Sequence, residues 1–335
     1  MSEQCKAEGK QQKNVMKTIK NIWHNYNYVI IFIGIFTAFV IVNGEQTTWT
    51  SITNIFLHSA TLGTIALGMG LVVLTGDIDL SVGSSFVFIG GLTILFYNKT
   101  GNILLTLLCA LFIGVICGFI NGFLVGNWKM PSFIVTLATM LIFRSISQYM
   151  MNEMDETRYR IDAGKASYQN LFELGNGSIA TIGNIVILFA LLAVMMIYIT
   201  TCTKFGKHVY ALGSNEKAAK LAGVKVVWTR IKVFVICGGL VGFGSFLKIA
   251  KDTSFDPATS GRNFELYSIA AVVIGGISMS GGKGRIAGII FGTMSFTLID
   301  KIITALGMNA LLNDTVKGMI LLIAVGLQMI RKNQE

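Results

Sequence analysis

The residue types that could carry out chemistry lie in two short glycine-rich segments between apolar runs. In the first segment, 74–84, Asp77 and Asp79 stand two residues apart. Paired carboxylates can serve as a general acid and a general base, but no positioned histidine or nucleophile accompanies them. We therefore assign no catalytic residue and do not expect the chain to be an enzyme.

The second segment, 275–285, contains a lysine among glycines and serines, which invites comparison with a phosphate-binding loop. Such a loop has a glycine six positions before its lysine and a serine or threonine directly after it. Around Lys283 those two positions hold Ile277 and Gly284. We therefore expect no nucleotide-binding loop and no cofactor in this chain. The three histidines are isolated in the sequence, so no metal site is indicated.

The composition limits which elements can position these segments. The chain has 335 residues, of which 53% are hydrophobic and only 13% are charged, whereas soluble domains carry about 25% charged residues. This argues against disorder, a disulfide scaffold and an ordinary soluble enzyme. The five cysteines form no CxxC pair and are expected to be free thiols. The formal charge of +10 falls between apolar runs, which indicates membrane orientation and not a nucleic-acid partner.

Apolar runs recur along the whole chain, and about 20 apolar residues are needed to cross a bilayer. The runs are 28–44, 53–76, 82–97, 103–126, 131–151, 181–202, 231–250, 266–281, 286–307 and 312–330. They predict an all-α polytopic membrane protein with about ten transmembrane helices. We expect one transmembrane domain, 28–330, between an N-terminal tail, 1–27, and a C-terminal tail, 331–335.

The distribution of Lys and Arg predicts the orientation, because cytoplasmic loops carry an excess of both. With the N-terminus in the cytoplasm, the inside segments hold sixteen of these residues and the outside segments hold six. Both termini are therefore expected to be cytoplasmic. The polar connection 152–180 then faces outward, and the basic connection 203–230 faces the cytoplasm.

Glycines recur every fourth residue, which places them along one stripe of a helix. They are Gly114, Gly118, Gly122 and Gly126, then Gly284, Gly288 and Gly292, and also Gly238 and Gly242. Small residues allow close helix packing in lipid, so we expect these stripes to be packing surfaces. The alternative is a surface that slides during a conformational cycle.

Several charged residues lie within or near the apolar runs, where an unpaired charge facing lipid is costly. Arg144 and Asp300 are the deepest by position; each either lines a polar cavity or belongs to a structural pair or interface. Asp77 and Asp79 either sit at the cytoplasmic interface or mark a broken helix that points into a pathway. Residues 72–74 and 272–274, each followed two residues on by a glycine, hint at an internal repeat.

The cytoplasmic connection 203–230 has the composition of a short helix over 215–222. Asn215 is suited to cap the start of this helix, and Gly223 occupies the position directly after its end. A solvated amphipathic connector is the alternative interpretation.

Four longer motifs resemble the ribose/xylose-type simple-sugar permeases of ABC importers. They are ALGMGLVVLTGDIDLSVGS (66–84), INGFLVG with FIVTLATM (120–140), KFGKHVYALGSNEKAAKLAGVKV (204–226) and AAVVIGGISMSGGKGRIAG (270–288). They occur in the family's order over residues 55–330. One departure is Asp77, which stands where family members often have a second glycine.

The resemblance implies three groups of functional residues. Those implied to couple to an ATPase subunit are Gly213, Asn215, Glu216, Ala218, Ala219 and Gly223. The helix-break glycines are Gly76, Gly83, Gly275, Gly276, Gly281, Gly282 and Gly284. The candidates for the translocation pathway are Asp77, Asp79, Ser81, Asn121, Thr136, Thr139 and Arg144. Of these, Asp79 and Ser81 match the family's motif, Asp77 is the departure from it, and the last four are inferred from spacing.

The resemblance also implies a function and its partners. The chain is expected to be a multi-pass permease subunit in a bacterial cytoplasmic (inner) membrane, importing a simple sugar. It would work with a second permease chain, an extracytoplasmic solute-binding protein and cytoplasmic ATPase subunits that bind the ATP. Permeases for nucleosides, a furanone-like signal or branched-chain amino acids are the alternatives within the superfamily. An ATP-independent secondary transporter is the alternative outside it.

Overall fold

The structure is a computed structural model. It describes residues 28–154, 158–164, 166–179, 181–309 and 312–332. The predicted tail 1–27 lies outside the described residues, as does most of the predicted tail 331–335.

Helices coincide with each predicted apolar run. They are the helix Tyr28–Gln46, whose last turn is η1 (Gly44–Gln46), α2 (Trp49–Leu74), α3 (Val82–Thr100), α4 (Ile103–Gly126), α5 (Ser132–Glu153), α7 (Asn184–Cys202), α10 (Val226–Asp252), α11 (Phe264–Ile274), α12 (Ile286–Ala305) and α13 (Asn313–Lys332). Seven of these described helices are long and apolar enough to cross a membrane; α3, α11 and α13 are not among them.

The predicted span 266–281 is wrong in its second half. Helix α11 has only 11 residues and ends at Ile274, so it covers about 16 Å at 1.5 Å per residue. The glycines that follow cannot extend the helix, because Gly276, Gly281 and Gly282 all have positive φ. Helix α10 begins at Val226, so the cytoplasmic connection is also shorter than predicted.

The predicted outer connection 152–180 contains its own secondary structure. It holds β1 (Tyr159–Arg160), α6 (Ala166–Asn176) and β2 (Ser178–Ile179). Strand β1 pairs antiparallel with β4 (Ser254–Phe255), which follows α10, and β2 pairs with β3 (Ile182–Gly183). The C-terminal ends of α5 and α10 are thereby joined.

The glycine stripe of α4 packs against α10. A Cβ on Gly114 would overlap the carbonyl oxygen of Gly238, and a Cβ on Gly118 would overlap that of Phe234. In return, Gly238 approaches Gly114, and Gly242 approaches the backbone of Ala110. The stripes of α4 and α10 are thus close packing surfaces, as predicted. Gly288 and Gly292 of α12 likewise approach Gly275 and Ala271, but the prediction is wrong for Gly284, which precedes α12 and has φ of +121°.

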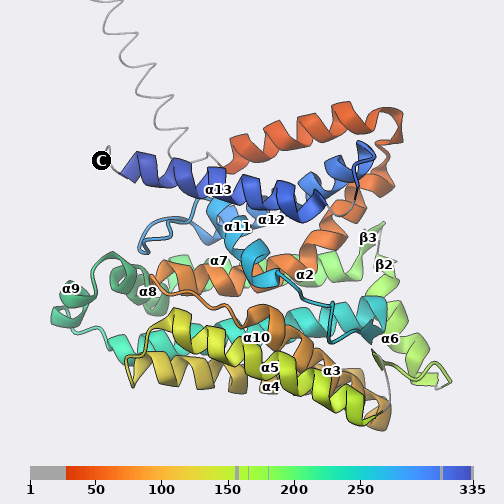
Figure 1. Ribbon diagram of the computed structural model, residues 1–335, viewed down its shortest axis with the longest axis horizontal. Coiled ribbons are helices and arrows are strands. Elements are labelled where there is room, and N and C mark those ends of the chain that lie inside the picture. Colours follow the sequence, from red (N-terminus) through yellow and green to blue (C-terminus); the bar gives the residue numbers. More distant parts are fainter. Residues whose placement is uncertain (1–27, 155–157, 165, 180, 310–311, 333–335) are drawn as a thin grey trace, which may run out of the picture.

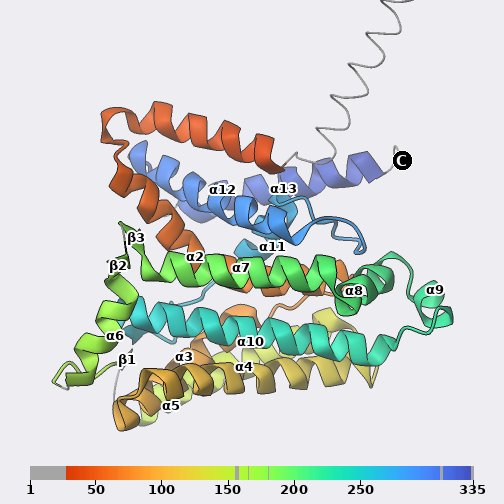
Figure 2. The same ribbon diagram turned by 180° about the vertical axis from the view of Figure 1, so that it is seen from behind.

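The long helices run roughly side by side, and the short helices α8 (Lys204–Ser214) and α9 (Glu216–Leu221) project from one end (Figures 1 and 2). The first described residues and the last turns of α13 lie toward this same end (Figures 1 and 2). Helix α9 is therefore well placed to meet another molecule outside the bundle.

Helices α2 and α11 end in the same backbone geometry. Gly76 and Gly276 both have φ of +82°. In each case the residue after the glycine donates its amide to the carbonyl of Val72 (3.2 Å) or Val272 (3.1 Å). This is the Schellman arrangement, which needs glycine at its left-handed position. The two segments that echo each other in sequence thus share a helix terminus.

Candidate functional site

Helices α8 and α9 are separated by the single residue Asn215. Its extended backbone ends α8, while its side chain accepts a hydrogen bond from the amide of Ala218 at 3.0 Å and so begins α9. Gly223 follows α9 with φ of +82° and donates its amide to Lys220. The helix predicted over 215–222 is present, whereas α8 was not predicted.

Helix α9 presents a small apolar surface to solvent. Ala218 is exposed, whereas Ala219 is 4% exposed and packs inward, so the two alanines do not share a face. Leu221 is 89% exposed. An exposed apolar side chain on a projecting helix is suited to enter a hydrophobic groove on a partner protein.

Gly213, near the end of α8, is wedged against the ends of both broken segments. A Cβ on Gly213 would overlap the carbonyl oxygen of Leu74, the last residue of α2. The same carbonyl accepts a hydrogen bond from the amide of Gly282 at 2.9 Å. We call Leu74, Gly213 and Gly282 the glycine junction. It joins α8 to the end of α2 and to the loop after α11 through backbone contacts alone.

Tyr210 adds a side-chain link beside the glycine junction. Its hydroxyl donates to the carbonyl oxygen of Gly284 at 2.9 Å. Burial raises the pKa of Tyr210, and the nearby charge of Arg285 only partly opposes this. The hydroxyl therefore stays protonated at neutral pH and keeps its donor role.

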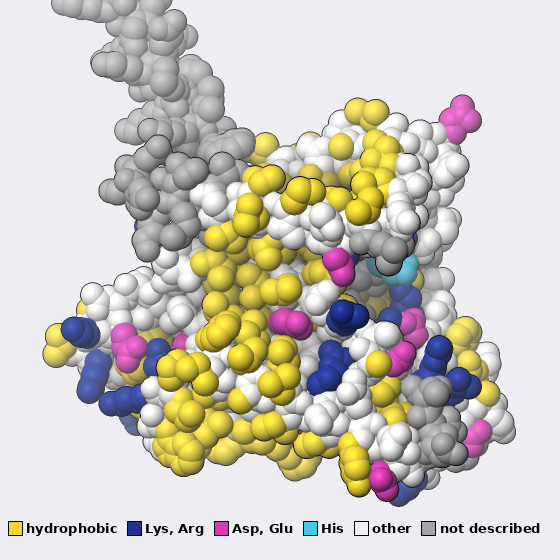
Figure 3. All heavy atoms as spheres, in the orientation of Figure 1, with side chains coloured by type: hydrophobic (Ala, Val, Ile, Leu, Met, Phe, Trp, Pro, Cys, Tyr) yellow, Lys and Arg dark blue, Asp and Glu magenta, His cyan; other side chains and the backbone are white. Residues whose placement is uncertain are grey.

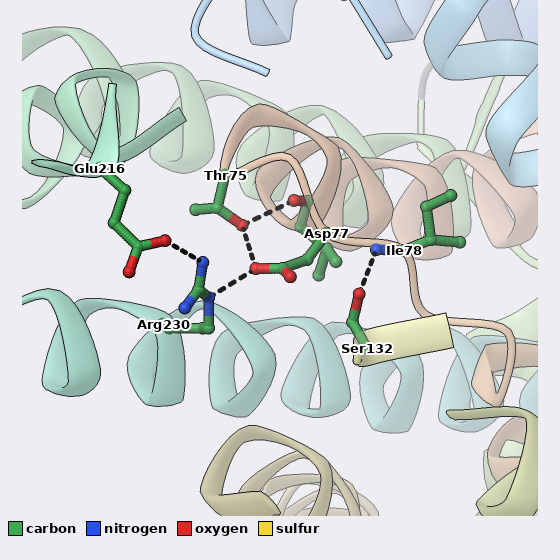
Figure 4. A network of polar contacts seen from close by, with 7 residues as sticks. Thr75, Asp77, Ile78, Ser132, Glu216 and Arg230 are labelled. Atoms are coloured by element: carbon green, nitrogen blue, oxygen red, sulfur yellow. Dashed lines mark hydrogen bonds and ion pairs between the residues drawn. The ribbon is translucent and has the colours of Figure 1, made fainter. Parts of the chain in front are cut away.

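Arg230 connects α9 to the segment after α2 (Figure 4). Its Nε lies 2.8 Å from Asp77 Oδ2, and its Nη2 lies 3.1 Å from Glu216 Oε2. Thr75 donates a further hydrogen bond to Asp77. The side chains of Arg230 and Asp77 are 15% and 11% exposed, whereas that of Glu216 is 55% exposed. The inner bond is thus largely buried, whereas the outer bond ends on an exposed carboxylate.

An open cavity of about 390 Å³ lies beside this ion network, against the connection between α4 and α5. Lys129, Ser132, Asp77, Glu216 and Arg230 contribute polar groups to its lining. Glu216 is the first residue of α9, so the cavity adjoins the end of the bundle from which α9 projects. It makes the ion network reachable from that side.

The remaining acidic residue of the first segment is held in the interior. Asp79 is 3% exposed and accepts hydrogen bonds from the amide and the hydroxyl of Ser81, at 2.9 and 2.6 Å. Asn121 of α4 donates to the same Ser81 hydroxyl at 2.8 Å. Thr136 of α5 accepts from the amide of Leu80 at 3.0 Å. These side chains fix the irregular backbone that leads into α3, and all four are buried.

Thr139 and Arg144 lie further along α5. The hydroxyl of Thr139 donates to the backbone of its own helix, at Val135 and Thr136. Arg144 donates to the carbonyl oxygens of Pro257 (3.0 Å) and Ser260 (2.8 Å). Of the pathway candidates, Arg144 therefore belongs to a different location from the Asp79 cluster.

The seven helix-break glycines divide into two groups. Five have positive φ, which favours glycine: Gly76, Gly276, Gly281, Gly282 and Gly284. The other two do not. Gly83 lies inside α3 and closely approaches the carbonyl oxygen of Gly261, while Gly275 approaches Gly288 of α12. Glycine is needed at these two positions because a neighbouring backbone lies too close for a Cβ atom.

Arg230 is the member of the ion network that sequence reasoning did not single out. The departure at Asp77 was the available signal, since a carboxylate that replaces glycine near a membrane segment requires a charged partner. Twenty-seven Lys and Arg residues were candidates for that partner, and only the fold selects one.

The sequence matches the family described as "Branched-chain amino acid transport system / permease component" over residues 51–325. The chain therefore belongs to this family of transport permeases. Seven helices among the described residues are long and apolar enough to cross a bilayer. As a member of this permease family, the chain is an integral protein of the cytoplasmic membrane and a transport subunit, not a catalytic enzyme.

Curated relatives are similar along most of the chain. Identity to the ribose import permease protein RbsC of Escherichia coli (strain K12) is 32% over 273 residues, covering 81% of this chain and 83% of that protein. Identity to the fructose import permease protein FrcC of Rhizobium meliloti is 32%, covering 91% and 85%. Identity to the xylose transport system permease protein XylH of Haemophilus influenzae is 29%, covering 95% and 100%. No solved structure matches the chain significantly.

Proposed function

We propose that the chain is the permease subunit of an ABC importer that carries a simple sugar across the cytoplasmic membrane. The observation that supports this is its similarity, over most of its length, to permeases named for ribose, fructose and xylose. In this proposal two permease chains form the pathway, and a solute-binding protein delivers the sugar to the outer face. Separate ATPase subunits bind the ATP, so the chain itself needs no cofactor.

Helix α9 is the proposed contact with the ATPase. The excess of Lys and Arg supports a cytoplasmic position for α8, α9 and both chain termini. Leu221 would enter a groove of the ATPase. When the ATPase moves α8 and α9, the glycine junction would transmit that movement to the ends of α2 and α11. Because the glycine junction is made of backbone contacts, it would move as a rigid unit.

Reconstitution in proteoliposomes tests the function. We expect uptake of radiolabelled D-ribose, D-fructose or D-xylose only when the permease, the ATPase, the binding protein and ATP are all present. An ATPase variant that cannot hydrolyse ATP is the matched control. Uptake by the permease alone would overturn the proposal in favour of a secondary transporter. ATP-dependent uptake of leucine or a nucleoside, without any sugar uptake, would overturn the sugar assignment only.

Two matched substitutions in α9 test the coupling contact. Leu221→Ser removes the exposed apolar side chain, whereas Lys217→Ser removes an exposed charged side chain from the same helix. We expect at least a tenfold loss of ATP-dependent uptake with Leu221→Ser, corresponding to about 1.4 kcal/mol, and little change with Lys217→Ser. Equal effects of both substitutions would contradict a docking role for Leu221.

A further inference from the structure

The loop between α10 and α11 enters the bundle from its outer end and reaches half depth. It begins at β4, which pairs with β1 beside α6. It ends at α11, whose first residues lie near Gly83 at the start of α3. Gly261 and Gly83 approach each other closely. A Cβ on Gly83 would lie 2.5 Å from the carbonyl oxygen of Gly261, and a Cβ on Gly261 would lie 2.6 Å from that of Gly83. The tip of the loop is therefore fixed against α3.

Arg144 sets the depth of this loop. It lies about 18 Å from the start of α5 and about 14 Å from its end, at 1.5 Å per residue, and α5 has 22 residues. Its guanidinium holds the carbonyl oxygens of Pro257 and Ser260 at 3.0 and 2.8 Å. Hydrogen bonds from a charged donor are among the stronger ones in proteins. The backbone around 257–260 is thereby fixed near the middle of the membrane-spanning region.

Polar side chains of this loop are nevertheless exposed. Thr259 and Arg262 are both exposed, as is Ala258. In Figure 3 acidic and basic side chains gather across the middle of this face, beside a broad hydrophobic area. The charged area is thus bordered on one side by an apolar surface of the kind that contacts lipid.

Lipid cannot cover this polar surface. Irregular backbone at membrane depth is tolerated only where it is buried in protein or lines a water-filled cavity. A charged side chain such as that of Arg262 costs roughly 2.5–3.5 kcal/mol at the centre of a bilayer, even on the lower scales. The exposed edge 258–262 must therefore face water or another polar surface in the assembled protein.

We propose that 258–262 lines the sugar pathway at half depth, and that Thr259 and Arg262 contact the hydroxyl groups of the sugar. This inference rests on the proposed function. A guanidinium donates several hydrogen bonds, and a threonine hydroxyl both donates and accepts, which suits a neutral solute rich in hydroxyl groups. Arg144 acts as a positioning residue, because it holds the backbone and leaves the exposed edge free.

Cysteine labelling in the complete importer tests this inference. Thr259→Cys and Arg262→Cys are each reconstituted with the ATPase and the binding protein, and treated with a charged methanethiosulfonate reagent that does not cross membranes. The matched control is Val194→Cys, near the middle of α7 and 65% exposed on an apolar surface. The unsubstituted chain gives the background from its native cysteines.

We expect labelling of both loop variants at least ten times faster than of Val194→Cys, and slower labelling when D-ribose is being transported. Labelling no faster than the control would overturn the inference. So would disulfide formation between the loops of two permease chains in place of labelling, because the edge would then be a packed interface. Fast labelling that D-ribose, D-fructose and D-xylose all leave unchanged would overturn the sugar contact.

The same proteoliposomes separate this inference from the proposed function. ATP-dependent sugar uptake by the unsubstituted chain, with loop labelling at the control rate, would reject only the pathway position. Absence of sugar uptake would reject the proposed function and, with it, the sugar contact, while fast loop labelling would still identify a water-filled pathway.

Discussion

Arg230 Nε lies 2.8 Å from Asp77 Oδ2 and so joins the first turns of α10 to the irregular segment after α2. The two residues are 153 positions apart in the sequence. Through its other nitrogen Arg230 also reaches Glu216 of α9. One guanidinium therefore links the proposed ATPase contact to the start of the broken segment.

Asp77→Asn should destabilise the protein more than Glu216→Gln. Either change removes one carboxylate partner of Arg230, but Asp77 is 11% exposed and Glu216 is 55% exposed. Leaving a shielded group without its charged partner costs about 1–3 kcal/mol, whereas an exposed ion pair contributes only about 0–1 kcal/mol. Thermal unfolding in detergent, monitored by tryptophan fluorescence, measures the difference. Equal melting temperatures for the two variants would contradict this reading of the network.

Gly118→Ala should lower the melting temperature and the yield of folded protein. The new methyl group would overlap the carbonyl oxygen of Phe234 on α10 and force α4 and α10 apart. Overpacking of this kind costs typically about 1–3 kcal/mol. Gly239→Ala is the control, because its methyl group would lie 3.7 Å from the nearest atom, Val115 Cγ2. It should leave the melting temperature nearly unchanged.

Gly223→Glu should leave the protein in the membrane but abolish ATP-dependent uptake. Nothing lies within 4 Å of the position, so the bundle can accept a side chain there. The φ of +82°, however, is strained for any other residue by about 1–3 kcal/mol, and the acidic group would lie on the proposed ATPase contact. Gly223→Ala carries the same backbone strain without the charge. A quantitative immunoblot and an uptake assay on the same vesicles check both variants, and full uptake by Gly223→Glu would exclude the contact.

Asp300→Asn should be more destabilising than Lys317→Met. The two side chains form an ion pair of 2.7 Å between α12 and α13, and Lys317 also lies over the rings of Tyr267 and Phe296. Removing Asp300 leaves a lysine that is only 8% exposed without its partner, whereas removing Lys317 leaves a carboxylate that is 36% exposed. The double variant should be less destabilised than the sum of the two single variants. A thermal-unfolding cycle measures this, and strict additivity would show that the pair does not interact.

Much of the helical framework could be predicted from the sequence. Runs of about 20 apolar residues mark helices because a membrane-spanning backbone must satisfy its own hydrogen bonds. The short helix capped by Asn215 and ended by Gly223 was predictable for a similar reason, since both signals act within a few residues. The glycine stripe of α4 also predicted a packing surface, although not that α10 would fill it.

The tertiary structure decided where the polar groups act. Asp77 and Asp79 are neighbours in the sequence, but in the fold Asp77 forms an ion pair with Arg230. Asp79 is instead hydrogen-bonded to Ser81, whose hydroxyl also accepts a hydrogen bond from Asn121. The fold also turned Arg144 toward a loop more than one hundred residues away. Burial and charge pairing depend on contacts between distant segments, whereas helix formation depends on neighbouring residues. The sequence by itself therefore determined most of the long helices of this permease, and only their packing determined which polar side chains are buried and which remain exposed.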